Sequence, residues 1–264
     1  MADAGTRSLS LQRNIILALL IAIAAAAWAM LVWQQMSMGM AMNTPTMGMR
    51  APLFLTVWVV MMVAMMFPTA APMILTFHQV QAGKRARGES FVSTWVFVAA
   101  YLLVWCLAGV LAYAGAVGAE AFAAHAQLSG AAAARIGGLV LIIAGAYQLS
   151  PLKNVCLSKC RTPMTFILTS WRDGVMGAIR MGLEHGVVCL GCCWLLFLIL
   201  FPLGIMNIAA MAVVTLLVFA EKALASGERI ARWAGIALVL YGIVVLVYPQ
   251  TLPTFMAGGG MSKN

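Results

Sequence analysis

Charged residues are scarce in this sequence. Only 9% of its 264 residues are Asp, Glu, Lys or Arg, and only seven of them are acidic. Soluble domains contain about 25% charged residues, so this scarcity excludes an ordinary water-exposed surface over most of the chain. Hydrophobic residues make up 64% of the sequence and recur from end to end without a polar block that could fold separately. The composition predicts one domain, 1–264, an all-α helix bundle in a lipid bilayer.

Cysteine is also sparse, and nucleotide-binding motifs are absent. Six cysteines are too few for a disulfide scaffold. Without a P-loop, a self-contained ATP-driven pump is excluded, and any transport is expected to be passive or to depend on a partner. The net charge of +9 comes from Lys and Arg in short connections between apolar runs, so we expect contact with lipid and none with nucleic acid. Nothing here predicts an enzyme.

About seven apolar segments have roughly the length needed to cross hydrocarbon about 30 Å thick. They cover 14–33, 53–77, 92–117, 136–150, 182–204, 206–220 and 233–249. The first is too long for the core of a signal peptide and no cleavage site follows it. Placing the N-terminus inside leaves only Arg50, Arg135 and Lys263 of the 16 Lys and Arg residues outside. The sequence therefore predicts a multi-pass inner-membrane protein with its C-terminus outside.

The predicted periplasmic connection, 34–52, is rich in methionine. Met36, Met38, Met40 and Met42 occupy alternate positions. Thioethers are soft and uncharged, so they favour Cu(I) over hard cations, and they withstand an oxidising compartment. In a flexible segment, such side chains could fold around one ion. The alternative is an apolar linker on the membrane surface.

Methionines also form a stripe on one face of the second predicted helix. They are Met61, Met62, Met65 and Met66, with Met73 beyond them. Pro68 and Pro72 leave backbone carbonyls without their helical donors, which is tolerated within a membrane only where protein or a cavity satisfies them. Taken alone, this pattern is most simply a methionine-packed, kinked helix. It becomes a candidate metal site if thiols face it.

The fifth predicted helix concentrates soft ligands on one face. They are Met181, His185, Cys189, Cys192 and Cys193. Imidazole and thiols at four-residue spacing suit a metal ion, and ionisable groups within a membrane are functional by default. The rise from His185 to Cys193 is about 12 Å, which predicts a ladder of ligands or a site completed by other helices. A purely structural stripe is the alternative. Gly182, Gly186 and Gly191 would let another helix approach.

Two further thiols, Cys156 and Cys160, lie among cations in the connection after the fourth helix. Nearby cations lower a thiol pKa, so this pair could transfer a metal or exchange disulfides. A reduced pair in a cytoplasmic loop is the structural alternative. Glu221 and Lys222, at the end of the sixth predicted helix, are most simply an interfacial ion pair.

The second and fifth predicted helices run in opposite directions, and each rises by the same distance per residue, so their residues can be matched by depth in the membrane. This depth matching places Met65 and Met66 level with Cys192 and Cys193. We expect these two helices to pack face to face, with a layer of thiols and thioethers near the middle of the membrane. A second layer would be built on His185 nearer the cytoplasm.

Three stretches together resemble a bacterial family of integral membrane proteins described as predicted metal-binding. They are 61–77, 147–163 and 172–222, with the core His-Gly-Val-Val-Cys-Leu-Gly-Cys-Cys-Trp. The resemblance implies membrane location and metal binding, and it supplies no substrate or reaction. It carries the ligand role to the second-helix methionines and to Cys156, Cys160, His185, Cys189, Cys192 and Cys193. The segment rich in methionine lies outside this pattern.

The leading hypothesis is a membrane protein that takes up, delivers or stores Cu(I). Zn suits thiols and imidazole too, but thioethers favour copper. A metallochaperone or metalloenzyme is the expected partner, and a homo-oligomer is compatible with the sequence. One alternative is a membrane thiol–disulfide oxidoreductase that uses Cys156, Cys160, Cys192 and Cys193. Another is an accessory subunit that assembles a copper membrane enzyme.

Overall fold

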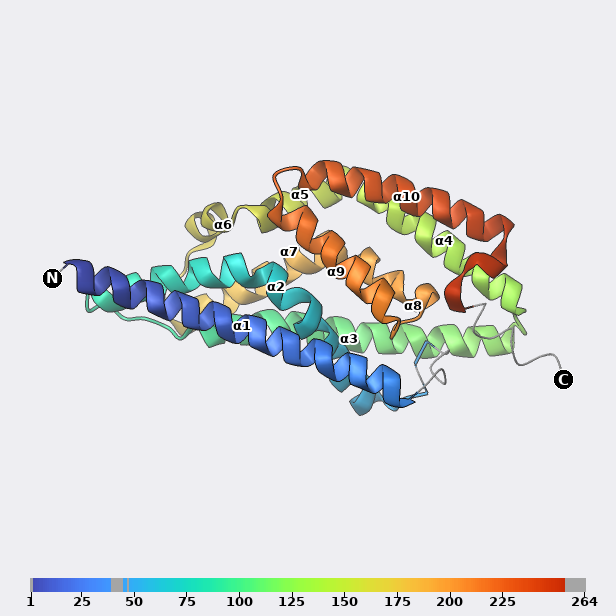
Figure 1. Cartoon of the computed structure of the whole chain (residues 1–264), viewed down its shortest axis with the longest axis horizontal. Coiled ribbons are helices and arrows are strands. Elements are labelled where there is room, and N and C mark those ends of the chain that lie inside the picture. The colour runs from blue at the N-terminus through green and yellow to red at the C-terminus, as the bar shows by residue number, and fades with distance from the viewer. Residues whose placement is uncertain (1, 39–44, 47, 255–264) are drawn as a thin grey trace.

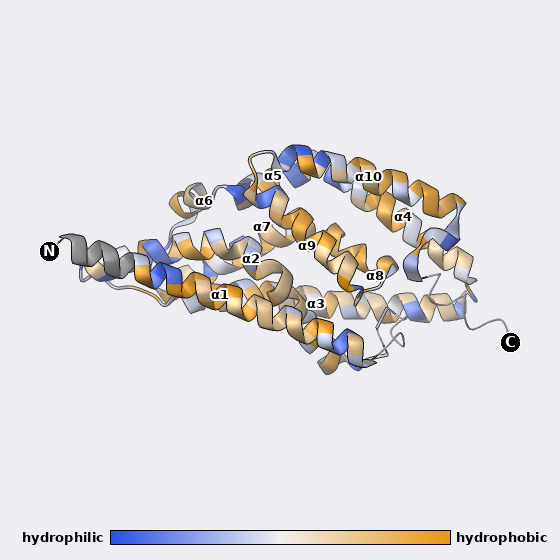
Figure 2. Ribbon diagram, in the orientation of Figure 1, coloured by the Kyte–Doolittle hydropathy of each residue, from blue (hydrophilic) through white to orange (hydrophobic). Residues whose placement is uncertain are grey.

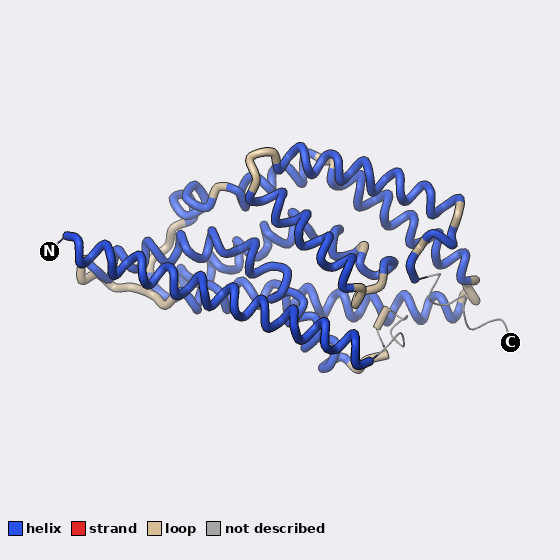
Figure 3. Tube along the Cα trace, viewed as in Figure 1, coloured by secondary structure: helices blue, strands red, loops and turns tan. Residues whose placement is uncertain are grey.

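The computed structural model describes residues 2–38, 45–46 and 48–254, with backbone alone for 2–9 and 38. All long regular elements of this part are helices, as Figure 3 shows. The seven longest are α1 (Ala2–Met38), α2 (Ala51–Ala86), α3 (Thr94–His125), α4 (Gly130–Gln148), α7 (Gly174–Leu198), α9 (Ile208–Ala223) and α10 (Gly227–Val247). Shorter elements are α5 (Pro151–Arg161), α6 (Pro163–Ser170), α8 (Leu200–Leu203) and the 3-10 turn η1 (Pro249–Thr251).

The long helices lie roughly along one axis (Figure 1). Six spans are long and apolar enough to cross a membrane, namely α1, α2, α3, α4, α7 with α8, and α10. Helix α9 has 16 residues, fewer than the about 20 that cross hydrocarbon. Figure 2 shows apolar residues along the helices, and hydrophilic ones gathered toward their ends. The all-α bundle is confirmed, whereas seven crossings and the orientation of the termini stay predictions.

Two short helices, α5 and α6, occupy what the sequence predicted to be a loop. The Ser150 side chain accepts a hydrogen bond from the backbone N–H of Lys153, and Pro151 and Pro163 occupy the first turns of α5 and α6. A serine cap followed by proline is a helix-start signal. The prediction missed it because apolar length was the criterion for a helix, and α5 is too polar and short to meet it.

Helix α7 packs closely on α3, and glycines permit this approach. A Cβ atom at Gly182 would lie 2.5 Å from the Phe97 carbonyl oxygen, and one at Gly186 would lie 2.7 Å from a Val104 methyl carbon. The expectation that these two glycines admit a neighbouring helix is confirmed, and the neighbour is α3. Small residues are the usual means of close helix packing in membranes.

A second glycine-mediated contact joins α4 to α10. A Cβ atom at Gly145 would lie 2.6 Å from the Gly235 carbonyl oxygen, and one at Gly242 would lie 2.7 Å from the Gly138 carbonyl oxygen. Each helix thus presents two glycines seven residues apart, which places both on nearly the same face. This pairing of α4 and α10 was not predicted, although the seven-residue spacing of the glycines is visible in the sequence.

Helix α2 bends near its middle (Figure 1), where Pro68 and Pro72 interrupt the ladder of backbone hydrogen bonds. Pro68 has no N–H for the Ala64 carbonyl oxygen, and the Trp28 indole of α1 donates to that oxygen at 3.1 Å. The expectation that protein satisfies a freed carbonyl is confirmed at Ala64.

The expected face-to-face packing of the second and fifth predicted helices is wrong. These helices are α2 and α7; α2 packs mainly on α1 and α3, and α7 mainly on α3 and α5. A residue's position in the sequence indicates its depth along its helix but not which helix lies beside it. Gly182 and Gly186 of α7 fit atoms of α3 and so bring these two helices together. The buried side chains of α2 and α7 nevertheless belong to one continuous apolar core.

Candidate metal centre

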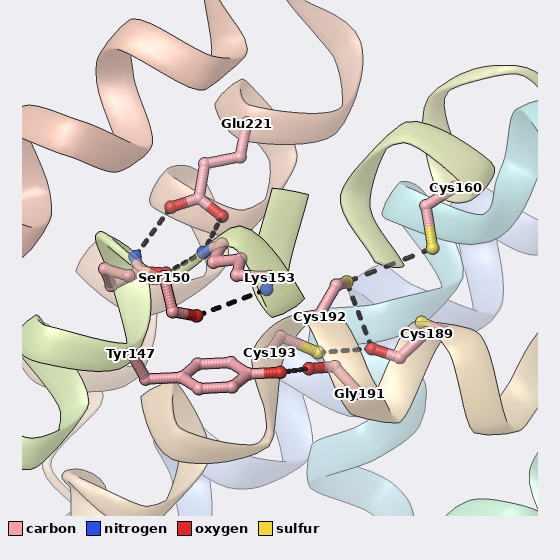
Figure 4. Close-up of polar contacts among 10 residues, drawn as sticks. Tyr147, Ser150, Lys153, Cys160, Cys189, Gly191, Cys192, Cys193 and Glu221 are labelled. Atoms are coloured by element: carbon pink, nitrogen blue, oxygen red, sulfur yellow. Dashed lines mark hydrogen bonds and ion pairs between the residues drawn. The ribbon is translucent and has the colours of Figure 1, made fainter. Parts of the chain in front are cut away.

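Thiols from two helices meet where α5 packs on α7. The Sγ atoms of Cys160 and Cys192 are 3.9 Å apart, and Figure 4 shows the Cys160 side chain directed at Cys192. The thiols of Cys192 and Cys193 donate to the Cys189 carbonyl oxygen at 3.1 and 2.9 Å, as serines often do within helices. None of these cysteines forms a disulfide. The structure therefore brings Cys160 to the thiol face of α7.

The Cys189 thiol contacts side chains from two further helices. It is fully buried, with the Tyr101 hydroxyl of α3 at 3.3 Å and the Lys222 ammonium of α9 donating at 3.1 Å. Ammonium–thiol contact favours the thiolate, the form that binds soft metals. Four helices thus converge on a small set of sulfur atoms.

His185 lies one turn before Cys189 on the same face of α7 and is 3% exposed. Its ring sits among Phe97, Tyr101 and Phe166, with centroid distances of 6.0, 5.5 and 5.7 Å. Neither ring nitrogen has a hydrogen-bond partner. A buried polar group without a partner costs about 1–3 kcal/mol, so these nitrogens are available as metal ligands and poorly explained as structural groups.

The predicted thioether ligands are buried in the same core. Met61, Met62, Met65, Met66, Met73 and Met181 are all at most 2% exposed. All five predicted ligands of α7 are buried too, so their common face is confirmed. Burial fits both a ligand role and packing, and which sulfur atoms would share an ion stays a prediction.

Within the described residues, no group of three or more His, Cys, Asp or Glu side chains is arranged to hold a metal ion. Thiols and thioethers are soft ligands of the types that bind copper. The donor chemistry of the centre therefore fits a soft metal ion.

The environment of Cys156 and Cys160 differs from the predicted one. Burial raises the pKa of Cys156, and hydrogen bonding with the thiols of Cys189 and Cys192, together with burial, raises the pKa of Cys160. The expected lowering by nearby cations is wrong, because α5 turns these thiols toward α7. Cys156 lies against Gly191, where a Cβ atom would be 3.1 Å from its sulfur.

Glu221 and Lys222 do not pair with each other, so the expected interfacial ion pair is wrong. Glu221 accepts from Lys153 at 2.6 Å and from Gln148 at 2.8 Å, and Lys153 also donates to Gln148. All three of these side chains are buried, and Figure 4 shows the contact between Lys153 and Glu221. Adjacent helical residues point about 100° apart, so Glu221 faces α4 and α5 whereas Lys222 faces the thiols of α7.

Several site residues were missed by sequence reasoning, namely Tyr101, Gln148, Lys153, Phe166 and Lys222. Their partners lie between 5 and 88 positions away, and most of these contacts depend on which helices pack together. The sequence held one usable signal, a lysine beside an apolar run. Such lysines were interpreted only as indicators of membrane orientation, although Lys153 is fully buried.

A pocket of about 620 Å³ opens beside the centre, between α5, α6 and the first half of α7. Phe166 lines it and also covers the His185 ring. Thr162, Thr165 and Glu184 supply part of its polar lining. The pocket lies one aromatic side chain away from the unpartnered nitrogens.

The predicted periplasmic connection, 34–52, is only partly described. Helix α1 continues through Met38, so Met36 and Met38 are helical rather than part of a flexible connection. Met36 is 81% exposed, whereas Met40 and Met42 lie outside the described residues.

Comparison with known proteins agrees with this chemistry. Searches of curated proteins and of solved structures gave no match. The model of the PpoB2 family, described as "Copper chaperone", matches residues 55–245. That range begins in α2, ends in α10, and includes all the thiols and the histidine of the candidate centre. The chain belongs to this copper chaperone family.

Proposed function

We propose that this protein is a membrane-integral copper chaperone that holds Cu(I), as cargo, at the buried centre between α3, α5, α7 and α9. Two thiolates from the cluster of Cys160, Cys189, Cys192 and Cys193 bind the ion, and His185 supplies a neutral imidazole. The α2 methionines supply thioethers along the path to this centre. Delivery to a metalloenzyme or another chaperone is the role that the family description supports.

The observation that carries the proposal is the buried His185 ring without a hydrogen-bond partner, one helical turn from a cluster of thiols. Buried polar groups without a hydrogen-bond partner are rare in native proteins, so we expect one to be retained only where it has a function. Intramembrane ionisable groups are costly and mark ion pathways. The family match supports copper as the ion.

Metal analysis of the purified protein tests this function. We expect about one or two equivalents of copper after loading with Cu(I), because the soft donors form one connected core. Replacing Cys189 and Cys192 together by Ser should remove most of it, since a hydroxyl is a hard ligand. Cys106→Ser is the matched control, because Cys106 on α3 is outside the thiol cluster. Equal copper in the double variant would refute the site.

Thiol–disulfide exchange is a second candidate, favoured by the 3.9 Å separation of the Cys160 and Cys192 sulfur atoms. A disulfide requires about 2.05 Å, which a change of side-chain rotamer could supply. The raised pKa of Cys160 makes its thiol a poor nucleophile at neutral pH. Peptide mapping without reductant after exposure to a dithiol oxidant would show a Cys160–Cys192 link if this function holds.

A further inference from the structure

Lys222 is a cation without an ion-pair contact to any carboxylate in the described part of the chain. Its neighbour Glu221 is bound by Lys153 at 2.6 Å, and both of those side chains are buried. The contact found for its ammonium is the Cys189 thiol, at 3.1 Å. One positive charge therefore stands directly at the candidate centre.

Such a charge changes which metal ion the thiols can hold. Two thiolates and one Cu(I) ion carry one excess negative charge, and the Lys222 ammonium cancels it. Two thiolates and one Zn(II) ion are already neutral, and with Lys222 the centre has one excess positive charge. Excess charge is costly in an apolar interior. The fixed cation therefore favours monovalent over divalent ions of equal softness.

The neighbouring network keeps this charge in place. Lys153 neutralises Glu221, so Glu221 cannot turn to pair with Lys222 without leaving Lys153 buried and unpaired. The consecutive positions of Glu221 and Lys222 on α9 direct their charges to different neighbours, as derived above. We propose that Lys222 is a specificity-determining residue that makes the thiol centre selective for monovalent soft metal ions. This inference rests on the proposed function, because it presumes that the thiols bind a metal.

Isoelectronic ions differ by one unit of charge, and comparing their affinity ratio between the wild type and its variants isolates the contribution of Lys222 from the difference in softness. Cu(I) and Zn(II) share one electron count, and so do Ag(I) and Cd(II). With full-length protein in detergent, competition dialysis gives the affinity ratio of each monovalent ion over its divalent counterpart. We expect Lys222→Gln to lower this ratio by about tenfold or more, because a unit charge acts strongly at short range. Lys222→Arg should preserve it.

Lys159→Gln is the matched control, since it removes the same charge from an exposed position on α5. An unchanged ratio in Lys222→Gln, or an equal fall in Lys222→Arg, would overturn the assignment. If Lys222→Gln does not yield folded protein, the wild type decides: equal affinity for Ag(I) and Cd(II) overturns it. A wild type that binds none of the four ions refutes the proposed function itself. A wild type that binds copper but shows no preference for monovalent ions refutes only the role of Lys222.

Discussion

His185 is the residue at which function and stability are expected to conflict. Its two buried nitrogens have no partners, which costs about 1–3 kcal/mol. We predict that His185→Leu raises the stability of the metal-free protein by up to about that amount and lowers copper retention. Thermal unfolding in detergent and metal analysis measure the two effects.

His125→Leu serves as the control, because His125 is exposed at the end of α3. It should leave copper retention unchanged. A clear loss of stability in His185→Leu, with copper retention intact, would show that the histidine is a packing residue and that the ligand role is wrong.

At the scale of a residue, the sequence predicts which side chains are buried but not what they touch. The common face of His185, Cys189 and Cys192 follows from the helical period alone, and these residues are buried as predicted. Lys222 beside Cys189 and Cys160 beside Cys192 could not be predicted, because these contacts depend on how α9 and α5 pack on α7.

At the scale of an element, the bend of α2 is coupled to α1 through one hydrogen bond. The Trp28 indole donates to the Ala64 carbonyl oxygen, which Pro68 leaves without a helical donor. We predict that Trp28→Phe costs about 1 kcal/mol of stability. In a Pro68→Ala background, the backbone N–H of residue 68 can donate to the Ala64 carbonyl oxygen in place of the indole. The stability cost of Trp28→Phe should therefore be smaller in that background. A double-mutant cycle of unfolding free energies measures this coupling.

Trp33→Phe is the control for loss of an indole, since Trp33 is exposed on the same helix. It should change stability little. If the Trp28 and Pro68 substitutions add within about 0.5 kcal/mol, the two positions act independently, and the indole does not compensate for the proline.

The contact between α3 and α7 sets the position of Tyr101 relative to Cys189. A Cβ atom at Gly182 would meet the Phe97 backbone at 2.5 Å, so Gly182→Ala must move one helix away from the other. We predict weaker copper binding and a loss of about 1–3 kcal/mol of stability, as in other overpacked contacts. Gly115→Ala on α3 is the control, because a Cβ atom there meets nothing within 4 Å. Unchanged binding in Gly182→Ala would separate this contact from the site.

Helix existence was easier to predict than helix extent or neighbours. Each of the seven apolar segments lies mostly within helical structure, because length and hydropathy suffice to recognise such helices. The polar α5, although preceded by the Ser150–Pro151 start signal, was missed. Packing of α7 on α3 rather than α2 depends on the fit of Gly182 and Gly186 to particular atoms of α3, which depth matching does not include.

At the scale of the whole molecule, the two ends of the bundle differ in what they carry. The N-terminus and the α2–α3, α5–α6 and α9–α10 connections lie toward one end, and the α3–α4 and α8–α9 connections lie toward the other (Figure 1). The predicted orientation assigns these two sets of connections to opposite sides of the membrane. That prediction requires α9 to cross, although its 16 residues span only about 24 Å.

A short α9 can cross because the protein shelters its inner end. The Arg161 guanidinium donates to the carbonyl oxygens of Leu224 and Ala225 at 2.8 and 3.1 Å, and Glu221 is neutralised within the bundle. These groups need not reach the lipid headgroups, since their polar partners are supplied by α5. A full hydrocarbon thickness is therefore unnecessary for this helix.

We predict seven crossings, with the N-terminus and the α9–α10 connection inside and the C-terminus outside. Reporters that are active on only one side of the membrane, inserted after Gly88, Gln127 and Ser226 and fused at the C-terminus, would measure this. The Gly88 and Ser226 insertions should report the inner side, and the Gln127 insertion and the C-terminal fusion the outer side. If α9 did not cross, the Ser226 and C-terminal reporters would both reverse while the first two stayed, because only the segments after α9 depend on its passage.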